Sequence, residues 1–349
     1  MKMRGVRWRA TVVALAGLTW TGVALAAPKV YVADEEGDTV TVLDATSFKT
    51  LATIAVGREP HNVQVSPDGR SAWLTVNAEA ARKGKDAAKH PGMPREAHEA
   101  MGEVGQAWMI DTATDHVAAK VTVGKHPAHV VLSPDGRFAY VTNGGDNTVS
   151  VVDTVARATV ATISVGAYPH GIRVSPDGRE AYVANLKGGT VSVIDTEARK
   201  EAATIVVGKG PAQVGFAPDG RTAFVSLSQE NAVAIIDPAT RKVMKKVPVG
   251  TVPTQLYATP DNRLLFAANQ GSKKAPGRTV SLIDLERLEV IKTIPTGPGA
   301  HGVVVTTDGR YAFVTNIYAN SVSVIEVADR KVVATVPVGK GPNGISVTP

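Results

Sequence analysis

Short runs rich in Val, Ile, Tyr and Thr alternate with clusters of Gly, Pro, Asn and Asp over most of the 349-residue chain. β-Branched and aromatic residues favour extended backbone, and the intervening residues favour turns. In residues 166–207 this predicts four strands, at 170–175, 180–185, 190–195 and 201–207. No segment has the length and 3.6-residue periodicity of a core helix. The pattern therefore predicts an all-β protein built of antiparallel hairpins.

The hairpin pattern repeats along the chain. A Val-Gly pair, replaced once by Thr-Gly, marks each repeat, with its glycine at Gly57, Gly124, Gly166, Gly208, Gly250, Gly297 and Gly339. Four of the six intervals are 42 residues, and the other two, 67 and 47, carry 25 and 5 additional residues. A unit of this kind must stack on its neighbours to bury its apolar face. Four antiparallel strands per repeat, arranged radially, form the blade of a β-propeller.

The chain length predicts the number of blades and how the ring closes. The 323 residues after residue 26, less the 30 additional ones, correspond to seven repeats of 42. Residues 343–349 match only the first strand of a repeat, whereas residues 29–33 match the second. We therefore predict a single seven-bladed domain over residues 27–349. Its C-terminal strand should become the innermost strand of the N-terminal blade, which leaves no open sheet edge.

Both longer intervals place their additional residues between the second and third strands of a blade, at about 78–105 and 271–278. In a propeller this connection lies on the same face as the loop before the innermost strand, which we call the top face. Pro94 can begin a short helix that Gly102 ends. Because long loops in compact domains are often functional lids, we expect segment 78–105 to form a top-face flap. A solvated flap without a binding role is the alternative.

The first 26 residues have the pattern of a secretory signal peptide. Four basic residues precede an apolar stretch at about 10–23, and Ala24–Ala26 supplies the small residues of a cleavage site. The apolar stretch is shorter than the roughly 20 residues that span a bilayer, with an uncleaved anchor as the alternative. We therefore expect a periplasmic or secreted protein that has no membrane span after cleavage.

Removal of this leader changes the charge balance. The net charge of +6 includes its four basic residues, so +2 remains. This is weak evidence for a nucleic-acid partner, and the 17 aromatic residues are not interleaved with charge as in single-strand binding sites. The chain has no cysteine, which excludes disulfides, thiolate nucleophiles and cysteine-ligated metals.

Four of the eight histidines fall at the start of an innermost strand, namely His61, His129, His170 and His301. Gln213, Gln255 and Asn343 occupy this place in other repeats. Imidazoles that converge at the mouth of a central channel can bind a metal, hold a cofactor or transfer protons. The alternative is that each histidine only hydrogen-bonds to neighbouring backbone, and the sequence is compatible with both interpretations.

The four histidines do not share one register. His61, His170 and His301 follow the repeat glycine by four residues, whereas His129 follows it by five. Adjacent residues of a regular strand point to opposite faces. The offset therefore argues against His129 joining His61, His170 and His301 as a metal ligand, although all four stay candidates for binding a ligand.

Segment 78–105 contains two His-x-x-Met pairs, His90 with Met93 and His98 with Met101. A thioether combined with an imidazole suits copper better than magnesium or calcium. On a helix the second pair would share one face. These pairs form a second candidate metal site, with a chance spacing in a solvated flap as the alternative.

Basic residues also gather on the predicted top face. Arg58, Lys125, Lys209 and Lys340 each follow a repeat glycine directly. A basic rim attracts acidic partners. We therefore expect a small anionic ligand or an envelope protein as the partner of a monomeric propeller, and no nucleic acid.

Residues 140–143 read Tyr-Val-Thr-Asn, and close variants occur at 182–185, 266–269 and 313–316. Together with the Ser-Pro-Asp-Gly-Arg turns and the Val-Ser-Val-Ile-Asp strands, these motifs resemble the YVTN (YncE-like) β-propeller repeat family over the whole mature chain. The resemblance implies the fold but little about activity, since such propellers include surface-layer proteins, binding proteins and relatives of redox-cofactor propellers. Similar propellers in nitrous oxide reductase and cytochrome-type nitrite reductases use top-face histidines around a metal or haem. This sequence has neither their additional domain nor a Cys-x-x-Cys-His motif.

No nucleophile elbow, phosphate-binding glycine-rich loop or His-Glu-x-x-His motif occurs in the sequence. We therefore expect a binding protein rather than an enzyme. Our first hypothesis is an exported scaffold that holds a ligand or protein partner on its top face near the channel. The alternative is a metal- or haem-dependent redox protein, or an accessory protein that handles a cofactor, and it would use the top-face histidines. Copper and haem are both compatible with the sequence, which requires neither.

Overall fold

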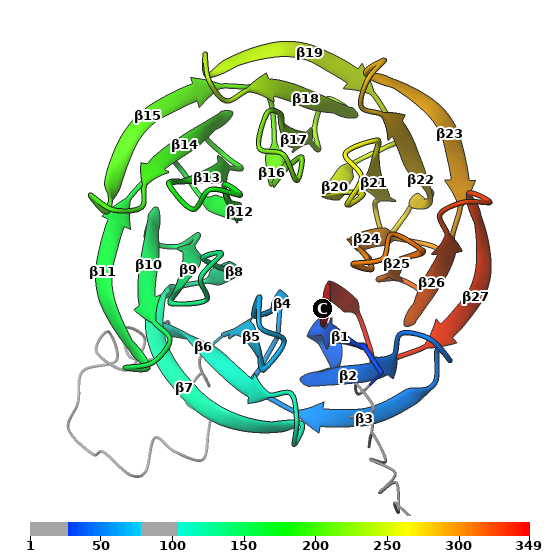
Figure 1. Cartoon of the computed structure of the whole chain (residues 1–349), viewed down its shortest axis with the longest axis horizontal. Helices are drawn as coiled ribbons and strands as arrows, with labels where there is room; N and C mark the ends of the chain where they lie inside the picture. The colour runs from blue at the N-terminus through cyan, green and yellow to red at the C-terminus, as the bar shows by residue number, and fades with distance from the viewer. Residues whose placement is uncertain (1–26, 78–103) are drawn as a thin grey trace, which may run out of the picture.

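The computed structural model describes residues 27–77 and 104–349, which form seven four-stranded antiparallel sheets around a central axis (Figure 1). A short 3-10 helix, η1 (Glu35–Gly37), follows the first strand of the chain. Within these residues, no helix is long and apolar enough to cross a membrane. The predicted seven-bladed propeller is confirmed.

From the innermost to the outermost strand, the first blade contains β28 (Pro342–Val347), β1 (Lys29–Asp34), β2 (Thr39–Asp44) and β3 (Thr50–Ala55). The second contains β4 (Val63–Val65), β5 (Ser71–Val76), β6 (Val104–Asp111) and β7 (His116–Lys125). The third contains β8 (Pro127–Leu132), β9 (Phe138–Asn143), β10 (Thr148–Asp153) and β11 (Ala158–Ser164). The fourth contains β12 (Pro169–Val174), β13 (Glu180–Asn185), β14 (Thr190–Asp195) and β15 (Lys200–Val206). The fifth contains β16 (Pro211–Phe216), β17 (Ala223–Leu227), β18 (Ala232–Asp237) and β19 (Lys242–Pro248). The sixth contains β20 (Pro253–Ala258), β21 (Leu264–Gly271), β22 (Pro276–Asp284) and β23 (Glu289–Pro295). The seventh contains β24 (Ala300–Val305), β25 (Tyr311–Asn316), β26 (Ser321–Glu326) and β27 (Lys331–Pro337).

The core lies between neighbouring blades. In the fourth blade the two middle strands are buried almost throughout, whereas the outermost strand is mostly exposed or half-buried. In the second blade β6 is less buried, with buried and half-buried positions. The second strand of every blade buries one large aromatic ring at the same position, at Tyr31, Trp73, Tyr140, Tyr182, Phe224, Phe266 and Phe313. Burying a side chain of this size contributes about 1.5–3 kcal/mol, so each repeat supplies its own anchor for the contact with its neighbours.

The recurring glycine and the recurring asparagine of the repeat contact each other. The Asn185 amide donates to the hydroxyls of Thr190 and Ser192 at 3.0 and 2.9 Å. A Cβ on Gly166 would collide with this amide. The loop that enters each blade therefore needs a residue without a side chain where it crosses the asparagine.

The two chain ends pair within the first blade. β28 is antiparallel to β1, and Val32 lies opposite Ile345. The Lys29 amide also donates to the Thr348 hydroxyl at 2.8 Å. The predicted closure by the C-terminal strand is confirmed (Figure 1).

The five-residue insertion lengthens the hairpin between β21 and β22, and Ser272 and Ala275 exchange backbone hydrogen bonds at its end. The predicted signal peptide and nearly all of segment 78–105 lie outside the described residues. His90, Met93, His98 and Met101, with the predicted short helix, fall in that part.

The first blade has an aspartate where four other blades have asparagine. Thr39 and Thr41 donate to Oδ2 of Asp34 at 2.9 and 2.7 Å, while Oδ1 is buried without a partner among residues 27–77 and 104–349. Burial raises the pKa of Asp34 to about 6, although both hydroxyls act to lower it. The blade therefore holds a carboxylate in a place better suited to a neutral group.

Deleting residues 344–349 should destabilise the whole ring, because β1 loses its inner partner and the first blade becomes an open edge. We expect a clearly lower melting temperature in a thermal melt followed by circular dichroism. Deletion of Pro349 alone, which lies beyond β28, is the matched control. A longer truncation that melts like the full chain would contradict closure by β28.

Asp34→Asn should stabilise the protein at pH 8 and have little effect at pH 4. The pKa of Asp34 is about 6 in the folded state and 3.8 in the unfolded state. The contribution of Asp34 to the free energy of unfolding therefore falls as the pH rises, and it is lowest above pH 6. At about 1.4 kcal/mol per pKa unit, the gain should be about 1–3 kcal/mol above pH 6. Urea unfolding at both pH values measures it, and an equal gain at both would show that ionisation of Asp34 is not the cause.

Candidate metal centre

A β-bulge interrupts the start of the innermost strand in six of the seven blades. In the fourth blade Pro169 pairs with Asn185 and Ile172 with Val183, so two residues, His170 and Gly171, lie opposite one. The equivalent shift occurs in five other blades, whereas in the second blade β4 pairs regularly from Val63 onward and His61 precedes it. A bulge of this kind suspends the strict alternation of side chains between the two faces. Residues four and five positions after the repeat glycine can therefore both be directed at the channel.

Most blades use only one of the two bulge positions for a polar side chain. Where the first carries His170, His301 or Asn343, the second is glycine. Where the second carries His129, Gln213 or Gln255, the first is Ala128, Ala212 or Thr254. A Cβ on Gly171 would collide with Gln213 of the next blade. Packing between adjacent bulges thus limits each of these blades to one large polar side chain at the channel.

A hydroxyl on the second strand holds the bulges in place. Thr142, the third residue of the YVTN motif, accepts a hydrogen bond from the His129 amide at 2.9 Å and donates to the His170 carbonyl at 2.6 Å. Thr75, Ser226 and Thr315 connect successive blades in the same way. The Thr or Ser at this position of the second strand therefore fixes the backbone from which the channel-facing side chains extend.

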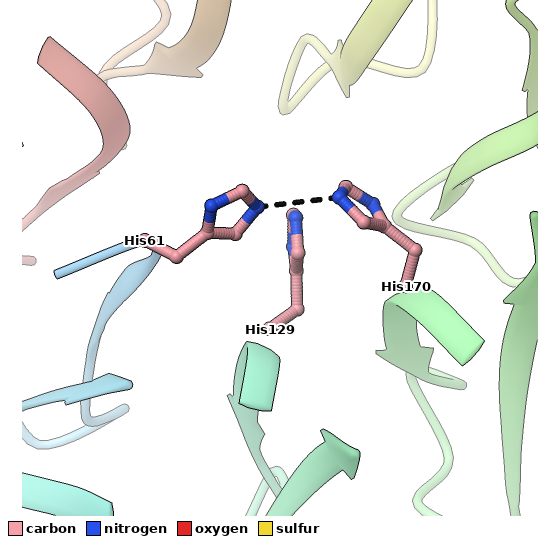
Figure 2. A group of neighbouring side chains, drawn as sticks. All are labelled: His61, His129 and His170. Atoms are coloured by element: carbon pink, nitrogen blue, oxygen red, sulfur yellow. Dashed lines mark hydrogen bonds between the residues drawn. The ribbon is translucent and has the colours of Figure 1, made fainter. Parts of the chain in front are cut away.

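Three histidines from consecutive blades converge at the top mouth of the channel. His61, His129 and His170 each direct one ring nitrogen to a common point, and these nitrogens all lie within 4.8 Å of one another (Figure 2). The Nε2 atoms of His61 and His170 are 3.2 Å apart, and the His129 ring points at the gap between them. The expectation that the register offset keeps His129 out of the cluster is wrong, because the bulge turns both positions toward the channel.

The partners of the outer ring nitrogens fix where the protons lie. Nδ1 of His61 is 3.0 Å from the Glu35 carboxylate, and Nδ1 of His170 is 2.9 Å from the Ala212 carbonyl. The Asn343 amide nitrogen, which donates to Glu35, is also 3.1 Å from Nδ1 of His61. The carboxylate and the carbonyl can only accept, so with a hydrogen on each Nδ1 the facing Nε2 atoms of neutral rings carry lone pairs. Nε2 of His129 is buried and has no hydrogen-bond partner among the described residues. In these tautomers His61 and His170 direct lone pairs at one point. Nδ1 of His129 is 3.4 Å from the Gln213 amide nitrogen, which is a donor, so Nε2 of His129 offers a lone pair only after its hydrogen moves to Nδ1 or is lost.

Glu35 is a functional residue that the sequence interpretation missed. It lies in η1 and accepts hydrogen bonds from His61 Nδ1 and, at 2.7 Å, from the Asn343 amide. Burial acts to raise the pKa of Glu35, but the hydrogen bond and charge of His61 outweigh burial and lower it to about 2. Its position in the repeat could have identified Glu35 from the sequence. Glu35 directly follows the YVTN-like segment, and it is the only charged residue at that position in the described repeats.

The environment keeps the buried imidazoles neutral. Burial and the neighbouring His61 lower the pKa of His170 to about 4. Burial, followed by the charges of His170 and His61, also lowers the pKa of His129 well below its usual value. Neutral imidazole is the form that binds metal ions. Protons therefore compete weakly for the lone pairs of these two rings near neutral pH.

His301 is placed apart from the three-histidine cluster. It lies on β24 and is only 7% exposed, and neither ring nitrogen has a hydrogen-bond partner among the described residues. Burial, with the charge of His61, lowers its pKa to about 3. His301 is thus a buried neighbour of the site rather than a member of the group whose nitrogens converge.

The basic residues of the predicted rim do not form one cluster with the histidines. Arg58, Lys209 and Lys340 lie on three separate loops between blades, and Lys125 is the last residue of β7. Acidic side chains accompany two of these residues, because Asp146 and Glu230 accept hydrogen bonds from the amides of Lys125 and Lys209. Binding of an anion by this rim stays a prediction.

Two protein-family models match the chain. One, the Choice-of-anchor I domain, matches residues 93–252, and the other, the YNCE-like beta-propeller, matches residues 272–348. Antigen Lp49 of Leptospira interrogans is 27% identical over 124 residues, which are 35% of this chain and 25% of that protein. The chain therefore matches about a quarter of the length of this curated relative.

Solved propellers share the fold at low sequence identity. Kuenenia stuttgartiensis hydrazine synthase aligns with a TM-score of 0.66 at 23% identity, covering 82% of this chain and 89% of that one. The periplasmic gluconolactonase PpgL of Pseudomonas aeruginosa aligns with a TM-score of 0.70 at 18% identity, covering 92% and 99%. Identities this low show the fold alone. The YNCE-like match over residues 272–348 and the seven-bladed ring support the resemblance to the YncE-like family of β-propellers.

Proposed function

We propose that this protein is an exported β-propeller scaffold that binds one transition-metal ion at the top mouth of its channel, through His61, His129 and His170. The observation that carries the proposal is the approach of two Nε2 atoms to 3.2 Å while both Nδ1 atoms face acceptors. Two neutral rings in these tautomers cannot hydrogen-bond to each other. A cation between them, either a proton or a metal ion, resolves the contact.

The dimensions favour a metal ion. Zinc–imidazole bonds of about 2.0–2.1 Å separate two nitrogens of a tetrahedral site by about 3.3 Å, close to the 3.2 Å between His61 and His170. His129 reaches the same ion after a small movement, since its nitrogen already lies within 4.8 Å. Its unpartnered buried Nε2 has no other role among the described residues.

The outer contacts match those of metal-binding histidines. Such histidines typically donate their second ring hydrogen to a carboxylate or a backbone carbonyl, which orients the ring and raises its basicity. Glu35 does this for His61, and the Ala212 carbonyl does it for His170. Imidazole ligands suit zinc, copper, nickel and iron.

Three protein ligands leave a coordination position for a further group. In zinc proteins this arrangement is typical of sites that bind water or substrate. The position makes the top face a place where a small ligand can bind through the metal. A single ion fits the cluster better than haem, because a porphyrin would have to lie between nitrogens that are only 3.2 Å apart.

We assign the protein to the cell envelope or the exterior. The signal-peptide pattern of residues 1–26 and the match to the Choice-of-anchor I domain support this location. The solved propellers contribute no activity to the proposal, since they share only the fold with this chain.

The mature protein should bind one equivalent of zinc or copper, and loss of one histidine of the cluster should weaken binding by at least roughly a hundredfold, since a direct ligand is lost. Competition titration with a chromogenic chelator measures the affinity of His61→Ala, His129→Ala and His170→Ala. His301→Ala should keep the stoichiometry, because His301 lies outside the converging group. His116→Ala, an exposed histidine on β7, is the surface control.

Binding that is absent, or equally strong in all five variants, would show that the histidines are structural. If His301→Ala lost more metal affinity than His129→Ala, the metal ligands would be His61, His170 and His301, the three histidines that share one register in the sequence.

Glu35→Gln should lower metal affinity by about 10–100-fold while one equivalent still binds, because the amide orients His61 but does not raise its basicity as a carboxylate does. The same titration measures the effect, with Glu59→Gln on the neighbouring exposed loop as control. Unchanged affinity in Glu35→Gln would remove Glu35 from the site.

A further inference from the structure

A second ring of side chains faces the channel, three residues further along each innermost strand than the first bulge position. It consists of Gln64, Val131, Arg173, Gly215, Tyr257, Val304 and Ser346. Arg173 is its only charged member. The Arg173 guanidinium donates to Oε1 of Gln64 at 2.9 Å and lies 6.0 Å from the centre of the Tyr257 ring. It therefore spans from the fourth blade to the second and sixth blades.

The charge of Arg173 has no counter-ion in the described part of the chain. Its contacts there are the Gln64 amide and the Tyr257 ring, and no carboxylate pairs with it. Burial lowers the pKa of Arg173, but a guanidinium stays protonated at neutral pH. A partly buried cation with only neutral neighbours is destabilising by itself. The missing partner is an anion.

The space beside Arg173 can hold a small molecule. A cavity of about 260 Å³ opens at the bottom end of the channel, with Gln64, Arg173 and Tyr257 in its wall. This volume exceeds by several times the roughly 30 Å³ of one water molecule. Apart from these three residues its wall is largely apolar, including Val131, Val305 and Val347. The cavity thus combines one forked cationic donor with a hydrocarbon surface.

We propose that the bottom mouth of the channel is a binding site for a small carboxylate with a short hydrocarbon body. The guanidinium of Arg173 receives the carboxylate in a bidentate pair, the arrangement that its planar fork favours. The valines of the cavity wall contact the hydrocarbon part. This site is at the opposite end of the channel from the three histidines and does not depend on the metal ion.

Hexanoate is a suitable probe, and calorimetric titration of the mature protein at constant ionic strength measures its binding. We expect saturable binding to the wild type, with the same affinity in metal-free and metal-loaded protein. Hexanamide lacks the charge and inorganic phosphate lacks the hydrocarbon body, so neither should bind comparably. Binding of phosphate as strong as that of hexanoate would reduce the site to a general anion site and overturn the proposal.

Arg173→Met should weaken hexanoate binding at least tenfold without lowering the ligand-free melting temperature, because the variant also removes an unpaired charge. Arg179→Met is the matched control, since the Arg179 side chain lies on the same face and is 85% exposed. Its affinity should equal that of the wild type. Absence of binding to the wild type, or unchanged binding to Arg173→Met, would overturn the proposal.

If Arg173→Met does not fold, Arg173→Lys decides the question. It keeps the charge but lacks the planar fork, so we expect several-fold weaker hexanoate binding in a folded protein, as judged by circular dichroism. Wild-type affinity in this variant would overturn the bidentate pairing. Loss of metal binding with hexanoate binding intact would contradict only the proposed metal site.

Discussion

Antiparallel pairing between β1 and β28 is the interaction on which the other features of this protein depend. Each blade buries its apolar faces only against its two neighbours, so an incomplete first blade would leave two neighbours without a partner. Closure also fixes the radius of the ring. That radius decides how far side chains on different inner strands lie from one another, and it brings residues such as His61 and His170 into contact across 109 positions of sequence.

Within the closed ring, the bulge at the start of six of the seven inner strands determines which of their side chains reach the top of the channel. The YVTN threonine is bonded to the bulge of its own blade and to that of the next, as Thr142 connects His129 with His170. The family motif therefore has a mechanical role that extends to the candidate site. It connects the position of one histidine to the next through a single hydroxyl, so the backbone itself helps to position the cluster.

The two ends of the channel differ in chemistry although the same strands build both. At the top, the imidazoles of His61 and His170 approach each other through Nε2, and Glu35 is hydrogen-bonded to the outer nitrogen of His61, an arrangement that suits a cation. At the bottom, the guanidinium of Arg173 meets no carboxylate of the described residues and is open to an anion. Repetition of the backbone allows this division, because each blade contributes an inner strand of nearly equal geometry and its side chains can vary independently.

The sequence by itself determined the fold to the level of individual strands, since the 42-residue period, the turn residues and the unmatched terminal strands each depend on local preferences. It also identified the histidines at the channel mouth. The membership of the cluster was decided only by the tertiary structure: a bulge, which has no signature in the alternation of residues, brought in His129 and left His301 apart. Glu35 and Arg173 were likewise decided there, because burial and the absence or presence of a charged partner arise only when seven strands from distant parts of the chain surround one axis.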